Sequence, residues 1–414
     1  MAAKGRSNGK ASLPEGWKWS TLGECCEFLD GKRVPVKSDD RQKMAGDIPY
    51  YGASGIIDWV NDFIFDEPLL LLAEDGENIN SRQLPVAFRV NGKCWVNNHA
   101  HVLRVSTNAV SEYLEAYLNS IDLMGYSTGT AQPKLNRDTC DKLPVPVPPV
   151  PVQKTIARVL GGVDDAIAAT RAVIEQTRKL KTALLQDLLT NGLPGRHTSF
   201  HDDPKAGRYP TDWNMVSLDD LVLADRPICY GILMPGRGCP GGIPVVKVKD
   251  IFNGQIRTGN LLLTTPELDE EYRRSRLQSG DLLITIRGTT GRVAVVPDSL
   301  ANANITQDTA RVSVEDEYVR DFLYICLQGS YLQRQIANHT IGQAVKGINI
   351  GEVRKLQVPL PDAEELKSIV ELINSVDLKV RTERLLLSQL LETKSALSQR
   401  LLTGQISVTG DCHG

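Results

Sequence analysis

Two long stretches of the chain place apolar residues every three or four positions, with charged residues between them. One stretch covers residues 152–190 and the other follows residue 362, and this spacing is typical of coiled-coil helices. At ~1.5 Å per residue, the first predicted helix is roughly 55–60 Å long. Gly192 and Gly404 mark the expected helix ends. The predicted helix–helix or partner-binding positions are Ile156, Leu160, Val163, Ile167, Ile174, Leu184, Leu188, Ile369, Ile373, Val376, Val380, Leu387, Leu397 and Leu401.

Shorter apolar runs bounded by Gly, Asn and Asp predict strands in the segment before each long helix. A Pro-rich exit at 143–151, matched by 356–361, predicts stiff extended chain. Pro151 suits the first turn of a helix, and Asp362 with Glu365 suits a helix cap. The predicted strands are 68–73, 94–97, 243–248, 281–286 and 293–296, and the shorter predicted helices are 110–120 and 318–337.

The two halves of the chain are copies of one unit. The run that ends in Trp17 recurs at Trp213, 196 residues later, whereas the segment 129–136 recurs at 342–349, 213 residues later. The second offset then holds without a gap to the end of the helices, so the second copy carries 17 extra residues in its middle. Solenoid repeats are far shorter than this unit, so duplication of a whole domain with its helix is favoured.

The predicted fold is mixed α/β: two pseudo-symmetric domains, each followed by a long helix, with the two helices packed as an antiparallel coiled coil. The antiparallel arrangement follows from chain order if a pseudo-twofold axis relates the copies. The expected division is a flexible tail (1–12), a first domain (13–150), its helix (151–192), a linker (193–208), a second domain (209–361), its helix (362–404) and a C-terminal tail (405–414).

Composition narrows the class of protein. Of the 414 residues, 41% are hydrophobic and 23% charged, which is typical of globular domains. The net charge of −3 argues against a general polyanion binder but allows a local basic surface. The eight cysteines form no CxxC pair, which favours free thiols in a reducing cytoplasm. No apolar run approaches the ~20 residues of a membrane span, and residues 1–12 lack the apolar core of a secretory signal.

Catalytic and metal-binding motifs were not found in the sequence. There is no GxxxxGK[ST] loop, and Gly288–Arg292 is too short and lacks the lysine. The segment around Pro361 and Glu365 has weak similarity to a nuclease motif, but helix capping explains it better. His99 and His101 alternate on a predicted strand and would face the same side. A metal pair is conceivable there, but no third ligand is evident, so two polar surface or groove residues are favoured.

The order of these segments resembles the specificity subunits of type I restriction–modification systems. The resemblance covers nearly all of residues 13–408 and rests on order and duplication, because no single motif is diagnostic. One departure is that the first copy has Ala73-Glu-Asp-Gly76 where the second has Thr285-Ile-Arg-Gly288. The segments similar to the family's target-recognition domains and spacer regions are Trp17 and Trp213, 46–51, 279–285, 288–291, the Pro-rich exit and 184–190.

The resemblance implies a non-catalytic DNA-binding subunit that reads a bipartite target, with one half-site for each domain. It further implies partners: double-stranded DNA, two modification (methyltransferase) subunits and restriction (translocase/nuclease) subunits. S-adenosylmethionine, ATP and Mg²⁺ would then be bound by partner subunits and none by this chain. The alternatives are a coiled-coil scaffold with protein-binding domains and, with less support, a catalytic nuclease.

Reading a base sequence requires Arg, Lys, Asn, Gln or Thr at base edges and cations at phosphates. Residues 237–292 hold nine Lys or Arg against six Asp or Glu, a local charge of +3. Each candidate alone is equally compatible with a solvated surface residue, whereas the set favours contact with DNA. The repeated pairs Lys134 with Asn136 and Lys346 with Asn349 better suit phosphate binding or structure. The other candidates are Lys32, Arg33, Asn78, Asn80, Arg82, Asn97, Asn98, His99, Lys247, Lys249, Arg273, Arg274, Arg276, Arg287, Arg292 and Gln307.

Overall fold

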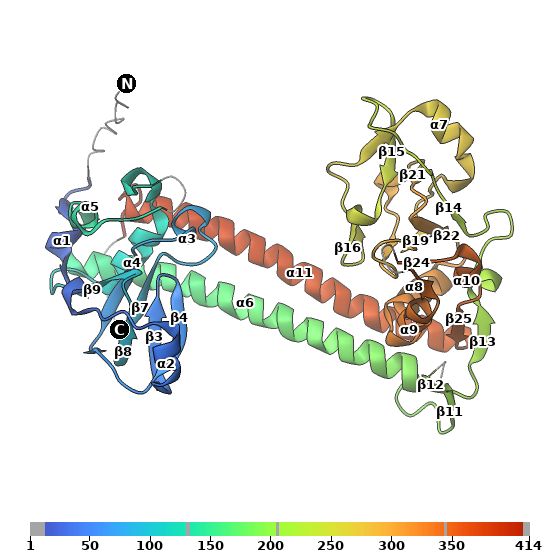
Figure 1. The fold of residues 1–414 in the computed structure, drawn as a ribbon, viewed down its shortest axis with the longest axis horizontal. Helices are drawn as coiled ribbons and strands as arrows, with labels where there is room; N and C mark the ends of the chain where they lie inside the picture. The colour runs from blue at the N-terminus through green and yellow to red at the C-terminus, as the bar shows by residue number, and fades with distance from the viewer. Residues whose placement is uncertain (1–12, 130–132, 204–206, 343–345, 409–414) are drawn as a thin grey trace. The chain divides into compact units, whose positions relative to one another are not determined.

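A computed structural model of the chain describes residues 13–129, 133–203, 207–342 and 346–408. The chain divides into two compact units (Figure 1): unit 1 holds residues 1–172 and 384–414, and unit 2 holds 173–383. Among the described residues, no helix combines the length and the apolar character that a membrane crossing requires. The tail expected at 1–12, and residues 409–414 of the C-terminal tail, lie outside the described residues.

The core of unit 1 is built around two four-stranded sheets, with strand orders β2-β9-β6-β7 and β4-β3-β8-β5. All five residues of β6 are buried, as its uninterrupted apolar run predicts for a central strand. Within the second sheet, β3 runs parallel to β8 and antiparallel to β4. The strands are β2 (Cys26–Phe28), β3 (Ala45–Gly52), β4 (Gly55–Val60), β5 (Phe65–Asp66), β6 (Leu69–Ala73), β7 (Ala87–Val90), β8 (Lys93–Val96) and β9 (Ala100–Val105).

A separate strand pair joins the start of unit 1 to its Pro-rich exit, because β1 runs antiparallel to β10. Tyr113 and Tyr117 donate their hydroxyl hydrogens to the carbonyls of Pro146 and Pro144. These two prolines have no backbone N–H and so cannot donate a hydrogen bond to a neighbouring strand. The elements are β1 (Lys18–Thr21), α1 (Leu22–Cys25), 3-10 helix η1 (Asp30–Lys32), α2 (Ser38–Gln42), α3 (Asn78–Ser81), α4 (Ser111–Ser120), η2 (Met124–Tyr126), α5 (Arg137–Asp141) and β10 (Pro144–Val147).

Unit 2 repeats this plan with strand orders β14-β22-β19-β20 and β18-β15-β21. Strand β15 runs parallel to β21, as β3 does to β8. Its exit strand β25 pairs antiparallel with β13, as β10 does with β1. The sheet strands are β13 (Asn214–Ser217), β14 (Cys229–Tyr230), β15 (Ile243–Val246), β18 (Leu262–Thr264), β19 (Leu282–Thr285), β20 (Val293–Val295), β21 (Asn304–Ile305), β22 (Thr309–Val312) and β25 (Gln357–Leu360).

Strand registers show where the extra residues of the second copy lie. The offset between equivalent residues rises from 195 at Tyr51 and Val246 to 212 at Ala73 and Thr285, so the 17 extra residues fall between β15 and β19. The remaining elements of unit 2 are β11 (Phe200–Asp203), β12 (Gly207–Pro210), η3 (Leu218–Leu221), η4 (Val248–Asp250), β16 (Ile251–Phe252), β17 (Gln255–Ile256), α7 (Pro266–Glu271), η5 (Arg273–Ser275), η6 (Asp298–Leu300), α8 (Glu317–Gln328), α9 (Ser330–Asn338), β23 (Thr340–Ile341), β24 (Gly347–Ile348) and α10 (Ile350–Arg354).

The two long helices are α6 (Val150–Asn191) and α11 (Ala363–Leu402), and they pack together in opposite directions. In unit 1, Ile156 and Leu160 of α6 share a core with Leu401 at the far end of α11. In unit 2, Leu188 at the end of α6 shares a core with Ile369 at the start of α11. Ion pairs accompany both contacts: Lys394 with Asp164 in unit 1 and Lys181 with Asp377 in unit 2. The mixed α/β fold with an antiparallel helix pair is therefore confirmed.

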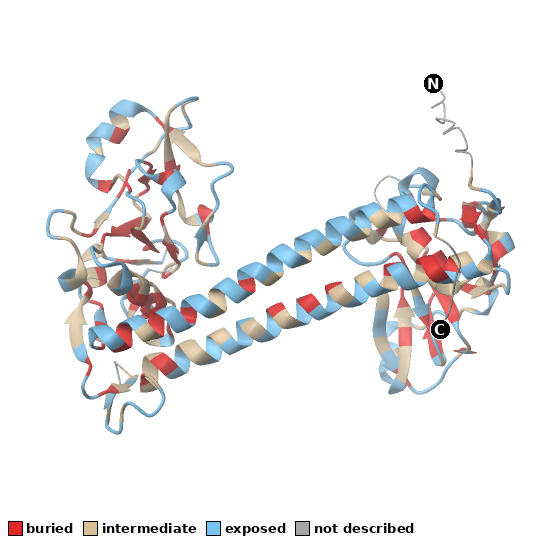
Figure 2. Cartoon of the chain, turned by 180° about the vertical axis from the view of Figure 1, so that it is seen from behind, coloured by how far each residue is buried: buried red, intermediate tan, exposed pale blue. Residues whose placement is uncertain are grey.

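The predicted apolar stripe follows the covered side of both helices (Figure 2). None of its fourteen residues is exposed. Nine are buried, namely Ile156, Leu160, Ile167, Ile174, Leu188, Ile369, Ile373, Val380 and Leu401. Half-buried positions are Val163, Leu184, Val376, Leu387 and Leu397.

Three local predictions require correction. The helix expected at 318–337 is two helices, because Gly329 adopts an extended conformation and lies where a Cβ would meet the Leu189 side chain at 2.5 Å. Asp362 does cap α11, accepting from the backbone N–H groups of residues 364 and 365. Glu365, however, is buried and accepts instead from the Leu193 N–H and the Trp213 indole N–H.

The third correction concerns Lys247 and Lys249, which do not lie on a strand. Strand β15 ends at Val246, and the Asp250 carboxylate accepts from the Lys247 N–H and turns the chain into η4. Lys247 is half-buried and Lys249 is exposed.

Candidate nucleic-acid interface

In each unit, three chain segments at one end of the sheets are joined by the same main-chain hydrogen bonds. In unit 1 the Glu74 N–H donates to the His99 carbonyl at 2.9 Å, and the Glu74 carbonyl accepts from the Leu135 N–H at 2.7 Å. In unit 2 Ile286 makes the same two bonds, to the Asp308 carbonyl at 2.8 Å and from the Ile348 N–H at 2.9 Å. We call these segments edge 1 (74–76, 97–99 and 133–136) and edge 2 (286–288, 306–308 and 346–349).

The strand register pairs the residues of the two edges one to one. Ala73 faces Ala100 across β6 and β9, and Thr285 faces Thr309 across β19 and β22. Counting from these pairs, Asp75 is equivalent to Arg287 and Asn98 is equivalent to Gln307. Because main-chain hydrogen bonds hold both edges, different side chains can occupy equivalent places on one scaffold.

A fourth segment adjoins each edge and differs in chemistry between the copies. Residues 30–35 read Asp-Gly-Lys-Arg-Val-Pro, whereas residues 230–235 read Tyr-Gly-Ile-Leu-Met-Pro. The Gln307 N–H donates to the Ile232 carbonyl, which places the apolar loop against edge 2. In unit 1, Arg33 donates to the Ala100 carbonyl at 2.8 Å. Both segments share the pattern Gly-x-x-x-Pro, a repeat that the sequence itself contains.

Edge 1 and the adjoining Asp30, Arg33 and His101 form an ion network whose members are buried or half-buried, except for the exposed Lys134. Arg33 donates to the Glu74 carboxylate at 2.6 Å, Lys134 lies 3.2 Å from the same carboxylate, and His101 contacts Asp30 at 2.7 Å. Burial disfavours charge on His101, but its interactions with Asp30 and Cys140 together outweigh this and raise the pKa of His101 to about 10. His101 is therefore an imidazolium at neutral pH, paired with carboxylates.

The two histidines do not face the same side, which corrects the sequence interpretation. His101 is buried and bonds Asp30 and the Leu135 carbonyl, whereas His99 precedes β9, is exposed and contacts Asp75 at 2.9 Å. The difference arises because His99 lies in the turn before the strand, where side chains do not alternate between faces. Among the described residues, no group of three or more His, Cys, Asp or Glu is arranged to hold a metal ion.

The remaining candidates of unit 1 are divided between exposed and internally bonded groups. Lys32 and Asn98 are exposed. Asn97 is buried and its side-chain oxygen accepts from the His99 N–H. Arg82, with φ 51°, donates to the Ile121 carbonyl. The amide side chains of the other three form bonds within unit 1: Asn78 with residues 84 and 85, Asn80 with Glu77, and Asn136 with Thr128.

Edge 2 presents side chains that are not paired in this way. Arg287 and Lys346 are exposed, and neither side chain has a hydrogen-bond or ion-pair partner among the described residues. The Asn349 oxygen accepts from the Gly351 N–H and caps α10, which leaves its amide hydrogens available. Arg287, Gln307 and Asn349 line a cavity of about 160 Å³ together with Tyr230, Leu233, Ile286, Ile348 and Ile350.

Three buried polar atoms of unit 2 lie on one short segment and lack a partner in the described structure: Thr306 Oγ1, Gln307 Oε1 and Thr309 Oγ1. Buried polar groups of this kind are normally hydrogen-bonded, so each requires a water molecule or a ligand as partner. Sequence reasoning selected Gln307 but missed both threonines, because nothing in the sequence shows which hydroxyls lack partners.

The arginines in and just after the extra segment of unit 2 differ from one another. Arg276 pairs with Asp269 and Glu270, both at 2.6 Å, and these hydrogen bonds raise its pKa. Arg273 and Arg274 are exposed, and Arg273 has one distant pairing, 3.8 Å from Glu270. Arg292 is half-buried and donates to the carbonyl of Ile251. Arg273 and Arg274 are thus accessible cations of this segment, as are Lys249 and Arg257.

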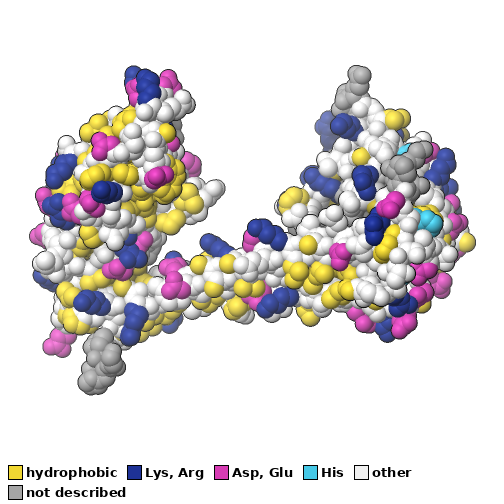
Figure 3. Space-filling model, turned by 90° about the horizontal axis from the view of Figure 1, so that it is seen from below, with side chains coloured by type: hydrophobic (Ala, Val, Ile, Leu, Met, Phe, Trp, Pro, Cys, Tyr) yellow, Lys and Arg dark blue, Asp and Glu magenta, His cyan; other side chains and the backbone are white. Residues whose placement is uncertain are grey.

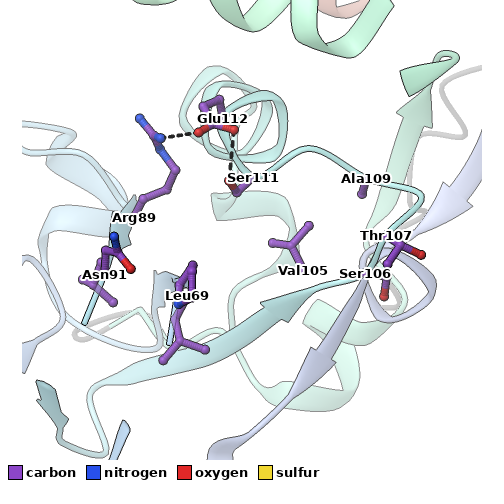
Figure 4. A pocket seen from close by; sticks show the side chains of 11 residues that line it. Leu69, Arg89, Asn91, Val105, Ser106, Thr107, Ala109, Ser111 and Glu112 are labelled. Carbon is purple, nitrogen blue, oxygen red and sulfur yellow. Dashed lines mark hydrogen bonds and ion pairs between the residues drawn. The ribbon is translucent and has the colours of Figure 1, made fainter. Parts of the chain in front are cut away.

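The other surfaces offer less. Figure 3 shows Lys and Arg interspersed with Asp and Glu on the face in view. A cavity of about 650 Å³ lies in unit 1. Among its lining side chains, Arg89 and Ser111 both contact Glu112 (Figure 4). Arg89 also pairs with Glu115 at 2.6 Å. The charges shown at this cavity neutralise one another, so the edges are the better candidate site.

Comparison with known proteins identifies the family. Residues 14–177 and 210–392 match the family described as type I restriction modification DNA specificity domain. The EcoBI specificity subunit of Escherichia coli is 30% identical over 273 residues, which cover 64% of this chain and 57% of the relative. The MjaVIII specificity subunit of Methanocaldococcus jannaschii is 24% identical over 414 residues, covering 96% of this chain and 94% of the relative.

The fold has a counterpart among solved structures. The crystal structure of the S subunit of a type I restriction–modification system from M. genitalium superposes with a TM-score of 0.59 at 13% identity, covering 95% of this chain and 98% of that one. The chain therefore belongs to the family of type I restriction–modification specificity subunits.

Proposed function

We propose that this chain is the sequence-specific DNA-binding subunit of a type I restriction–modification complex and that each unit reads one half of a bipartite target. The observation that carries the proposal is the duplicated edge. One hydrogen-bonded scaffold occurs twice, with Asp75, Asn98 and His99 in one copy and Arg287, Gln307 and Asp308 in the other. Equal scaffolds with different donors and acceptors suit two different base sequences.

Linking the two domains explains how modest contacts give specific binding. Once one domain is bound, binding of the second is intramolecular, and its effective concentration exceeds that of a free domain. The paired helices α6 and α11 would provide this link. A coiled-coil scaffold that does not read DNA is not favoured, because the family of the chain is defined by DNA specificity.

The chain would direct catalytic partners to the target and would not catalyse the reaction itself. We infer that it binds two modification subunits and recruits restriction subunits for cleavage. S-adenosylmethionine, ATP and Mg²⁺ would be bound by those partners. The long helices support partner binding, because both expose leucines away from their shared seam: Leu180, Leu372, Leu378, Leu385, Leu386 and Leu391. The cytoplasm is the compartment proposed for this complex, as seven described cysteines are free thiols.

Two measurements test the proposal. Expressing the chain with its modification subunits in a host that lacks this system should methylate adenines within one bipartite sequence, detected by methylome sequencing. The purified complex should bind that sequence more tightly than a scrambled one, with an affinity that falls steeply as salt rises. A complex that methylates no defined sequence and binds all DNA equally would contradict the proposal.

A further inference from the structure

Arg287 projects from a rigid base in edge 2. The Ile286 N–H donates to the Asp308 carbonyl, the Gly288 N–H donates to the Lys346 carbonyl, and Arg287 forms a β-bridge with Gly347. Gly288 has φ 75°, a left-handed conformation that favours glycine and turns the chain just after the arginine. The backbone is thus fixed on both sides, while the guanidinium has no partner among the described residues.

Gln307 presents an unsatisfied acceptor in the cavity that Arg287 also lines. Its backbone is held because the Gln307 N–H donates to the Ile232 carbonyl, yet its side-chain Oε1 is buried without a partner. The hydroxyls of Thr306 and Thr309 lack partners on the same segment. A ligand that offers both hydrogen-bond donors and acceptors would complement Gln307 and Arg287 together.

The surroundings of these two polar groups are apolar. Tyr230 and Leu233 line the same cavity, and Met234, which follows Leu233 in the chain, is 79% exposed. Ile341 lines a second cavity that Arg287 also lines, and it is 74% exposed. A phosphate group is met by cations and water and gains little from exposed apolar side chains. A base pair presents a polar edge flanked by apolar surface, including the thymine methyl group, which suits this combination.

Building on the proposed DNA-reading function, we propose that Arg287 and Gln307 read purines from the major groove in the half-site of unit 2. The guanidinium of Arg287 would donate two hydrogen bonds to guanine O6 and N7. The Gln307 amide would accept from adenine N6 through Oε1 and donate to N7. Edge 1 would read a different sequence, because Asp75 stands in place of Arg287 and cannot donate to guanine O6 and N7, while the shorter amide of Asn98 stands in place of Gln307.

The test compares Arg287→Ala, Arg287→Lys, Gln307→Ala and wild type, each assembled with the modification subunits. Methylome sequencing gives the recognised motif, and competition binding with single base-pair changes gives the discrimination at each position. Arg287→Ala should lower discrimination at one G·C pair by about 10- to 100-fold, and Gln307→Ala should do so at one A·T pair. Arg287→Lys should lose the same discrimination, because lysine keeps the charge but lacks the planar fork.

Three controls make the outcome readable. Asn98→Ala should change bases in the other half-site only. Arg334→Ala, at an exposed position of α9, should leave the motif unchanged. Thermal unfolding should show that the Arg287 and Gln307 variants are as stable as wild type, since neither side chain bonds to the rest of the described protein.

The proposal is overturned if both alanine variants keep the wild-type motif, or if their changes fall in the half-site that Asn98→Ala alters. It is also overturned if Arg287→Lys binds and discriminates as wild type while Arg287→Ala weakens binding to all sequences alike, since that pattern identifies a phosphate contact. Failure of the general function would appear earlier, as a wild-type complex without sequence preference.

Discussion

Edge 1 and edge 2 share a backbone but differ in how their side chains are satisfied. In edge 1, Glu74 is paired with Arg33 and Lys134, and the neighbouring Asp30 is paired with His101. In edge 2 the equivalent of Glu74 is Ile286, the equivalent of Arg33 is Leu233, and Arg287 has no partner among the described residues. The two edges therefore share a main-chain arrangement, because none of the hydrogen bonds that define it uses a side chain.

The side chains of the two edges therefore have different roles. Ion pairs in edge 1 stabilise unit 1 and also consume donors that could otherwise reach DNA. Edge 2 replaces them with apolar contacts and leaves polar atoms available. Each half-site can therefore be changed by side-chain substitution without rebuilding the sheet, which explains how the interior of the repeat diverged while its ends stayed alike.

The largest effect is expected from a substitution that breaks the ion network beside edge 1. Asp30→Ala should destabilise unit 1 by about 3 kcal/mol, because it leaves the buried His101 imidazolium without its carboxylate. Denaturant titration with thiol labelling reports each unit separately, since Cys26 is buried in unit 1 and Cys326 in unit 2. Labelling of Cys26 should shift to lower denaturant and labelling of Cys326 should not. Asp47→Ala, at an exposed position of β3, is the control, and an equal shift in both variants would contradict the prediction.

A pH titration tests the same network without mutation. The pKa of His101 is raised to about 10 in the folded chain, against about 6.5 when unfolded, so the folded state holds a proton that the unfolded state releases between these values. This stabilisation is fully present below about pH 6.5 and is lost as the pH rises through about 10. Unit 1 should therefore lose stability relative to unit 2, where Ala310 occupies the equivalent position.

The ratio of Cys26 to Cys326 labelling measures this loss. A rise in pH makes both thiols more reactive, and the ratio removes that common effect. His101→Gln should flatten the dependence. A ratio that does not change between pH 6.5 and 10 in wild type would show that His101 is not protonated in the folded chain.

The sequence predicted the elements that depend on local pattern. The helices α6 and α11 follow from apolar spacing, and β6 and β19 follow from uninterrupted apolar runs. It could not predict which cations are consumed by ion pairs, because partners such as Arg33 and Glu74 are 41 residues apart. Nor could it align Asn98 with Gln307, since the offset between copies changes from 195 to 212 and then to 209 within the domain.

A smaller effect is expected from the segment that only unit 2 contains. The double charge reversal Arg273→Glu with Arg274→Glu should weaken DNA binding about tenfold and leave the recognised bases unchanged, because both cations are exposed and suit phosphate contacts. Arg276→Glu is the informative contrast. It should destabilise α7 by breaking the pairs with Asp269 and Glu270, and so act on stability as well as on binding. Unchanged affinity of the double variant in the assembled complex would remove this segment from the interface.

The smallest effect is expected at Lys32, in the loop beside edge 1. Lys32 is exposed there, whereas Ile232 is buried at the equivalent place in unit 2, so a phosphate contact at this position is available to unit 1 alone. Lys32→Ala should lower affinity about two- to fivefold for every sequence alike and reduce the slope of log affinity against log salt by about 1. Binding titrations of the complex at several salt concentrations measure both quantities, with Lys43→Ala, an exposed lysine paired to Asp40, as control. Because a phosphate contact carries no base information, the methylated motif should stay as in wild type. A changed motif would show that Lys32 reads a base, and an unchanged salt slope would show that it does not touch DNA.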